Sequence, residues 1–424
     1  MSTSPDNSLR RDTLDTKDLV LLVLAAVAPM GIVVSLTTLS IALGTGAGTP
    51  GTYIVAALIF SVFAVGYLKM SQRITNAGAF YAYISAGFGE RAGRIAAWLA
   101  VMTYNAITIG TFGSLSFFSS LVLKDLTGID LAWQWFGVLW LAATLLLGYL
   151  DVGASAKVLA VALLLEVISL FAFDLAVLWD KGFHGFSLEV FDPSLVLGSG
   201  AGLSLILGLG SFIGFEATVI YGEEARDARR TVSRATYTAI ALIAVFYLTT
   251  TWAMVSAVGV EQAKVSAAAD PASFLFIINT QYVGILATQI MQVLVITSLF
   301  AGFLALHMSA ARYHFALARS GLLPAWMGKT HPKYLSPFNG TVVQLALVGA
   351  VTLAFVAANQ HPYLQMGVAL FGMGVLGIVL LQCLTSFAVL RYFRRERRGE
   401  SLWSTAIALV RWGEHAGGIL ADDR

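Results

Sequence analysis

Long hydrophobic runs alternate with short polar segments along almost the whole chain. About ten of these runs have the length that an α-helix needs to cross the hydrocarbon core of a bilayer. They lie at residues 19–43, 52–70, 95–123, 133–149, 157–179, 199–221, 235–258, 283–310, 341–358 and 364–390. Because the runs are unbroken, they lack the alternating pattern of a membrane β-barrel. The pattern therefore predicts an all-α integral membrane protein.

The overall composition supports this prediction. Of the 424 residues, 58% are hydrophobic and only 12% are charged, which departs strongly from the average soluble domain. The net charge of +2 gives no indication of a nucleic-acid partner. The first 18 residues are polar, and no cleavable signal peptide is visible. We therefore expect the lipid bilayer to be the main environment of the chain.

Basic residues divide unequally between the two sides of the predicted spans. Most fall on one side: Lys17, Lys69, Arg73, Arg91, Arg94, Lys157, Arg226, Arg229, Arg230, Arg234, Arg312, Arg319, Lys329, Lys333, Arg10, Arg11 and the cluster at 391–398. The other side has Lys124, Lys181 and Lys264. Since cytoplasmic loops are enriched in Lys and Arg, both termini are predicted to be cytoplasmic.

An even number of spans allows a division into two halves of five, inverted relative to each other. We expect a cytoplasmic N-terminal segment, a first repeat, an extracellular loop, a second repeat and a cytoplasmic tail, at residues 1–18, 19–179, 180–198, 199–393 and 394–424. The linkers between spans are short, and no soluble domain is predicted.

Two of the predicted helices contain helix-breaking residues. The first contains Ala28-Pro29-Met30-Gly31, and the sixth contains a glycine-rich stretch at 208–214. Proline removes a backbone donor and glycine lowers helix propensity. Either break alone is also typical of a kink or a packing surface. Corresponding breaks in two inverted halves, however, indicate a transporter binding site at mid-membrane, where N-termini of half-helices favour an anion and carbonyl ends a cation.

Three segments, taken in order, resemble one family. They are Thr-Asn-Ala-Gly-Ala-Phe-Tyr-Ala-Tyr at 75–83, Ser-Phe-Ile-Gly-Phe-Glu at 211–216 with the acidic and basic loop at 222–230, and the segment 311–324. Together they resemble the amino acid-polyamine-organocation permeases, which have the five-plus-five inverted repeat of the leucine transporter. The resemblance covers about residues 18–398. It implies secondary active transport by alternating access, with an amino acid or a related amine bound between helices 1 and 6.

The chain also departs from the family pattern. Ala228 and Ser233 stand where the family usually has proline, and the break in helix 1 has fewer glycines. Most members have about twelve helices, but the apolar patch at 402–410 is too short to span. The last two helices of the usual twelve are therefore expected to be missing. A truncated, non-transporting remnant or a receptor-like protein is the alternative, and an integral membrane enzyme is a weaker one.

The resemblance suggests substrate-binding candidates in and opposite the two breaks. These are Ala28, Met30, Gly31, Tyr104, Asn105, Gly210, Ser211, Phe212 and Gly214. Phe212 resembles the aromatic gate of the family, while Tyr104 and Asn105 are expected to face the cavity from helix 3. Ordinary packing is the alternative for the aromatic residues.

Two acidic residues within predicted spans are candidates for proton coupling. Glu166 lies in the middle of helix 5 among leucines, where an ionisable group is costly and is by default a functional hypothesis. The resemblance places it where proton-coupled relatives carry a lysine. It could instead bind a cation or form an interhelical hydrogen bond. Glu216 follows the break in helix 6, where it could relay a proton or brace the unwound segment.

Other chemistry is less evident in the sequence. Thr297 and Ser298 could line an ion site near helix 1, although such hydroxyls often bond to their own helix backbone. The chain has no phosphate-binding glycine loop and no His-Glu-x-x-His motif, so we expect no cofactor, no catalytic residue and no metal site. The expected partners are the small-molecule substrate, a proton and lipid. A homo-oligomer is compatible with the sequence.

Overall fold

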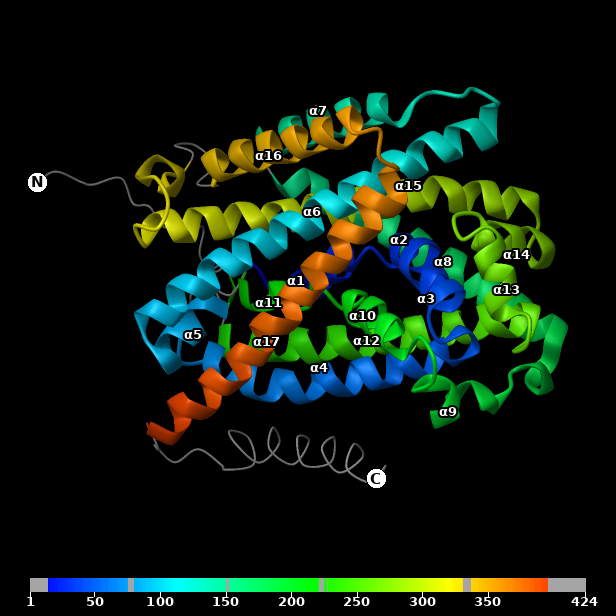
Figure 1. Cartoon of the computed structure of the whole chain (residues 1–424), viewed down its shortest axis with the longest axis horizontal. Coiled ribbons are helices and arrows are strands. Elements are labelled where there is room, and N and C mark those ends of the chain that lie inside the picture. The colour runs from blue at the N-terminus through cyan, green and yellow to red at the C-terminus, as the bar shows by residue number, and fades with distance from the viewer. Residues whose placement is uncertain are drawn as a thin grey trace, which may run out of the picture.

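The structure is a computed structural model that describes residues 14–74, 80–149, 152–220, 225–226, 228–330 and 337–395. Apart from an isolated bridge between Leu14 and Ala225, the regular structure of these residues is helical. Figure 1 shows long helices lying alongside one another, with short helical pieces near the middle of the molecule.

Helices coincide with each of the predicted spans. They are α1 (Thr16–Val27), α2 (Pro29–Ile32), α3 (Thr38–Leu43), α4 (Thr49–Ser71), α6 (Glu90–Thr127), α7 (Trp133–Tyr149), α8 (Val152–Gly185), α10 (Ala201–Gly210), α11 (Ala217–Ile220), α12 (Ala228–Val258), α15 (Ile285–Arg319), α16 (Phe338–Ala357) and α17 (Ala369–Arg395). Two π-helical segments, η1 (Val33–Thr37) and η6 (Pro362–Val368), continue into α3 and α17. Shorter connecting helices are η2 (Gly46–Gly48), α5 (Phe80–Phe88), η3 (Leu188–Phe191), α9 (Pro193–Val196), α13 (Ala263–Ala269), α14 (Phe274–Tyr282) and η5 (Ala325–Gly328).

Within the described residues, 7 helices are long and apolar enough to cross a membrane. Three other predicted spans correspond to shorter apolar helices, Pro29–Leu43, Trp133–Leu147 and Ala201–Gly210. Two of these are short because the first and sixth predicted spans are interrupted. We call these spans helix 1 (α1 to α3) and helix 6 (α10 and α11). The chain is therefore an integral membrane protein, and the number of ten spans stays a prediction. The patch at 402–410 lies outside the described residues.

Helices of the two halves contact one another in pairs. Figure 1 shows α4 lying beside α12, and these two helices are the second of each predicted half. The third helices, α6 and α15, pack together, as do the fourth helices, α7 and α16. Helix α10 contacts η1 and α3, so the broken helices 1 and 6 also meet. These contacts bring corresponding helices of the two predicted halves together.

Glycines allow α6 to approach η6 and α17 closely. A Cβ atom added at Gly110 would lie 2.6 Å from the Phe371 nitrogen and 2.7 Å from the Gly367 oxygen. One added at Gly113 would lie 2.7 Å from the Pro362 oxygen. Small residues permit such backbone contacts between membrane helices. The contact fixes the position of η6 and α17 next to the two breaks.

We expect Gly110→Ala to destabilise the protein, because its methyl group would collide with the backbone of α17. Overpacking of this kind costs about 1–3 kcal/mol, and the melting temperature of the purified protein should fall by several degrees. Gly372→Ala is the matched control, because an added Cβ there meets nothing within 4 Å. An equal effect of both substitutions on the melting temperature would contradict the proposed packing.

Candidate functional site

The first break separates α1 from α2 at a single residue. Ala28 has φ 50 and ψ 66, a left-handed conformation, and Pro29 begins the helix that continues to Leu43. A residue with a side chain pays roughly 1–2 kcal/mol in this conformation. The neighbouring structure must therefore hold the break in place.

Two distant helices supply hydrogen-bond acceptors to the N-terminus of this half-helix. The Met30 N–H donates to Oε2 of Glu166 on α8 at 3.4 Å, and the Gly31 N–H donates to Oγ of Ser298 on α15 at 3.1 Å. Glu166 is 2% exposed and Ser298 is fully buried. Glu166 and Ser298 thus form an N-terminal cap that comes from outside the helix.

The remaining donors of this first turn are also accounted for. Pro29 has no N–H, and the Ile32 N–H donates to the Ala28 carbonyl at 2.9 Å. The positive end of the half-helix dipole therefore faces the Glu166 carboxyl group. In this conformation no N–H of the first turn is left for an external anion.

The second break lies between α10 and α11, at residues 211–216. Gly214 has φ 119, which favours glycine over other residues. Its N–H donates to Oε2 of Glu216 at 3.0 Å, while the Tyr104 hydroxyl donates to Oε1 of Glu216 at 2.8 Å. Glu216 is 1% exposed. Glu216 therefore ties the unwound segment to itself and to α6.

Four other N–H groups of this break have backbone partners. Those of Ser211, Phe212, Ile213 and Phe215 donate to carbonyl oxygens three or four residues earlier, at 3.0–3.2 Å. The protein thus satisfies these four N–H groups itself. Carbonyl oxygens differ, because each has two lone pairs and can accept a second bond. The carbonyl oxygens of the breaks can therefore accept further hydrogen bonds.

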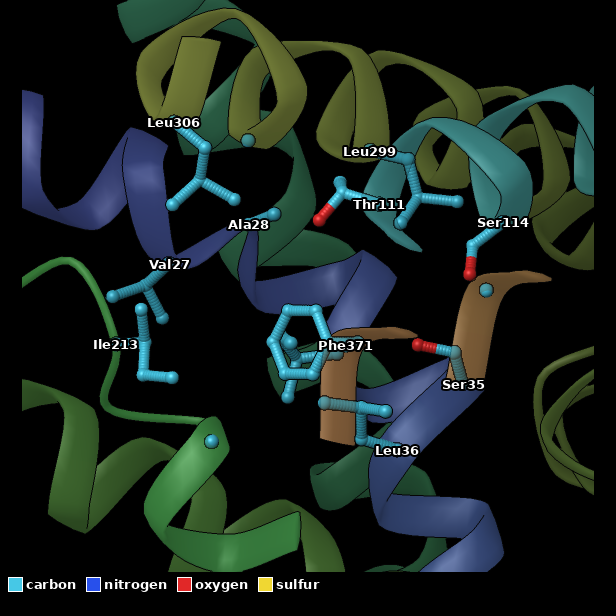
Figure 2. A pocket seen from close by; sticks show the side chains of 14 residues that line it. Val27, Ala28, Ser35, Leu36, Thr111, Ser114, Ile213, Leu299, Leu306 and Phe371 are labelled. Carbon is cyan, nitrogen blue, oxygen red and sulfur yellow. The ribbon is translucent and has the colours of Figure 1, made fainter. Parts of the chain in front are cut away.

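A small cavity lies where the two breaks meet α6, α15 and the η6–α17 segment. Its walls are largely apolar, and Ser35, Thr111 and Ser114 add hydroxyl groups. Figure 2 shows Val27 and Ile213 together on one side of it and the two serines on the other. The 14 lining residues are Val27, Ala28, Ile32, Ser35, Leu36, Thr111, Ser114, Gly210, Ile213, Leu299, Gly302, Leu306, Gly367 and Phe371.

The predicted substrate-binding residues occupy different places around this cavity. Ala28 and Gly210 line it, and Met30 and Gly31 lie beside it in the capped turn. Ser211 lies 3.2 Å from the Tyr53 hydroxyl, within hydrogen-bonding distance. The roles of these residues stay predictions.

The predicted aromatic and polar residues make contacts away from the lining. Phe212 is fully buried and stacks on Phe60 at 5.1 Å between ring centroids. Asn105 donates to the Val101 carbonyl at 2.7 Å. Thr297 donates to the Leu294 carbonyl of its own helix at 2.9 Å. Ordinary packing and hydrogen bonds to the backbone of the same helix would give these contacts. A functional role for these residues is still a prediction.

Sequence reasoning missed most of the cavity lining. The cavity is lined by Thr111 and Ser114 on α6, and by Gly367 in η6 and Phe371 in α17. These residues carry no charge and match no motif. The available signal was the spacing of Gly110, Thr111 and Ser114, which places small and hydroxylated residues on one face of a membrane helix.

One end of the broken helices is closed by polar contacts. Ser204 on α10 accepts the N–H of Thr45 at 2.8 Å and lies 2.8 Å from the Ser40 hydroxyl on α3. Lys264 on α13 donates to the Gly44 carbonyl at 2.9 Å. Because a cation at a helix C-terminus is favourable, Lys264 stabilises the packing of α13 against α3.

Comparisons with known proteins support the resemblance seen in the sequence. A family model described as amino acid permease matches residues 14–413. The branched-chain amino acid permease BcaP of Lactococcus lactis is 26% identical over 73% of this chain and 69% of its own. The low-affinity putrescine importer PlaP of Escherichia coli is 26% identical over 92% and 83%. A methylthioribose transporter of Bacillus subtilis is 26% identical over 84% and 78%.

Solved structures show the same fold at low sequence identity. A manganese transporter of Eremococcus coleocola matches with a TM-score of 0.54 and 11% identity, over 99% of this chain and 92% of its own. Mhp1 in its inward-facing conformation matches with a TM-score of 0.52 and 16% identity, over 99% and 89%. The predicted leucine-transporter fold is confirmed, and the relatives are transporters rather than enzymes.

Tyr104→Phe should lower the melting temperature, because it removes the hydroxyl that satisfies the buried Glu216 carboxyl group. Loss of a partner to a buried polar group costs about 1–3 kcal/mol. Tyr247→Phe is the control, since Tyr247 is equally buried and its hydroxyl has no hydrogen-bond partner among the described residues. If the two variants melt at the same temperature, the bracing role of Tyr104 is wrong.

Proposed function

Because the chain belongs to the amino acid permease family, we propose that it is a secondary active transporter of an amino acid or a related amine. The observation that carries the proposal is the cavity lined by Ala28 and Gly210, one from each interrupted helix. Mid-membrane breaks of this kind form the substrate sites of transporters with inverted repeats. Relatives named for branched-chain amino acids and for putrescine support a small nitrogen-containing solute.

Transport by alternating access is part of the proposal. The pairwise contacts between the halves support rocking of one group of helices against the other. We assign the closed end, where Lys264 on α13 and Ser204 on α10 bind Gly44 and Thr45 after α3, to the extracellular side. The conformation would then be one in which the outer path is shut, and opening would require these contacts to separate.

Proton coupling is assigned to Glu166, with Glu216 as a second candidate. Glu166 is buried in a membrane helix, and its carboxyl oxygen accepts the Met30 N–H at the break in helix 1. Protonation would remove the negative charge at the positive end of that half-helix. The proton would therefore change the relative stability of two arrangements of helix 1, which is what coupling requires.

Uptake by proteoliposomes tests the transport activity. Liposomes containing the purified protein, with an alkaline interior, should accumulate at least one labelled solute from a panel of amino acids and polyamines. A protonophore should abolish the accumulation. If no solute of either class enters faster than into liposomes without protein, the proposed function is wrong.

Glu166→Gln should abolish accumulation driven by a pH gradient while retaining exchange of labelled for unlabelled solute. The amide keeps a hydrogen-bond acceptor for Met30 but cannot take up a proton. Asp174→Asn is the control on the same helix, because Asp174 binds Thr250 at 3.0 Å rather than the break. Gradient-driven uptake that persists in the Glu166 variant would refute the coupling role.

Labelling of single cysteines tests the orientation, in which both termini are cytoplasmic. Cys383 is the only cysteine and can be replaced by serine. Ala132→Cys and Ser320→Cys then introduce thiols at exposed loop positions on opposite sides. A membrane-impermeant maleimide applied to intact cells should label residue 132 and not residue 320. The reverse pattern would contradict the assignment.

A further inference from the structure

The break in helix 1 carries its own carboxyl group. Glu166 and Ser298 bind the Met30 and Gly31 N–H groups, which are the donors that a substrate carboxylate would need at a half-helix N-terminus. We propose that Glu166 takes the place of a substrate carboxylate, so that the preferred substrate is an amine without a carboxylate. This inference rests on the proposed function for the location of the substrate site.

The contacts at the break make the two groups competitors. A substrate carboxylate could reach the first turn of α2 only by displacing the Glu166 and Ser298 side chains. Both are buried and each accepts a hydrogen bond at the break, so displacement would leave a buried polar group without its partner. Two carboxyl groups sharing this turn would also repel each other.

At the second break, the N–H groups of residues 211–215 are also occupied. Its N–H groups at Ser211, Phe212, Ile213 and Phe215 bind backbone carbonyls, and that of Gly214 binds Glu216. Glu216 again supplies a carboxyl group from the protein itself. The N–H groups of the first turn of α2 and of residues 211–215 are therefore already bonded within the protein in this conformation.

The cavity lining favours a hydrogen-bond donor as its ligand. None of the 14 lining residues is Lys, Arg or His, so no cation is present to pair with a carboxylate. The Ser35, Thr111 and Ser114 hydroxyl oxygens can accept bonds from an ammonium group, as can the lone pairs of backbone carbonyls at the breaks. Apolar residues such as Val27, Ile213 and others of the lining would contact the hydrocarbon part of an amine.

Matched ligand pairs test the inference in the purified protein. Each pair consists of an amino acid and the amine that lacks its carboxyl group: leucine with 3-methylbutylamine, and ornithine with putrescine. Kd values come from the rise in melting temperature as ligand is titrated at constant pH. In at least one pair the amine should bind roughly tenfold more tightly than the amino acid. Tighter binding of the amino acid in either pair, or no binding of any amine, would overturn the inference.

Substitution of the cap tests the role of Glu166 in this preference. Glu166→Gln removes the charge and should reduce the amine-to-amino-acid affinity ratio by roughly tenfold or more. Ser298→Ala frees the Gly31 N–H and should strengthen binding of the amino acid member. Asp174→Asn, whose carboxyl group binds Thr250, should leave the ratio unchanged. A residue with only a structural role would weaken both ligands equally, and an unchanged ratio in both cap variants would contradict the proposal.

The binding and uptake assays separate this inference from the proposed function. An amine that binds with the expected preference but is not transported would leave the inference standing and refute the transporter proposal. Transport of an amino acid that binds more tightly than its amine would support the transporter proposal and refute the inference.

Discussion

The structure depends on one constraint, the need to satisfy backbone groups where a helix is interrupted away from water. Hydrocarbon offers no partner to a peptide N–H, so a break persists only where other parts of the protein supply one. At helix 1 the partners are Glu166 and Ser298, which come from helices far away in the sequence. At helix 6 the partner is Glu216, which also accepts a hydrogen bond from Tyr104 on α6. Each break is thus tied to the surrounding helices.

This constraint determines the chemistry of the cavity. Glu166 and Glu216 each bind an N–H group of a break, and the polar side chains of the cavity lining are the hydroxyls of Ser35, Thr111 and Ser114. The close packing of α6 against η6 and α17 at Gly110 and Gly113 then brings Phe371 and Gly367 up to the breaks. A small amine meets an environment that suits both its ends, with acceptors for the ammonium group and apolar walls for the carbon chain.

The sequence was sufficient for the fold class and for the approximate positions of the long helices. Unbroken apolar runs and the Ala28-Pro29 and Gly208–Gly214 signals are local features, and they predicted both interruptions correctly. The partners of the breaks were not predictable in the same way. The contact between Glu166 and Met30 joins residues 136 positions apart, and nothing in the local pattern indicates which N–H a buried acid will bind. The cavity lining was missed for a related reason, since Thr111, Ser114 and Phe371 resemble ordinary packing residues.

A structure of the protein with a transported solute bound tests the central claim most directly. The account predicts density for the solute between Ala28 and the unwound segment 211–216, with the Met30 N–H still bonded to Glu166 and the ammonium group directed at oxygen acceptors. A solute bound elsewhere, or helices 1 and 6 continuous through residues 28 and 211–216, would contradict it.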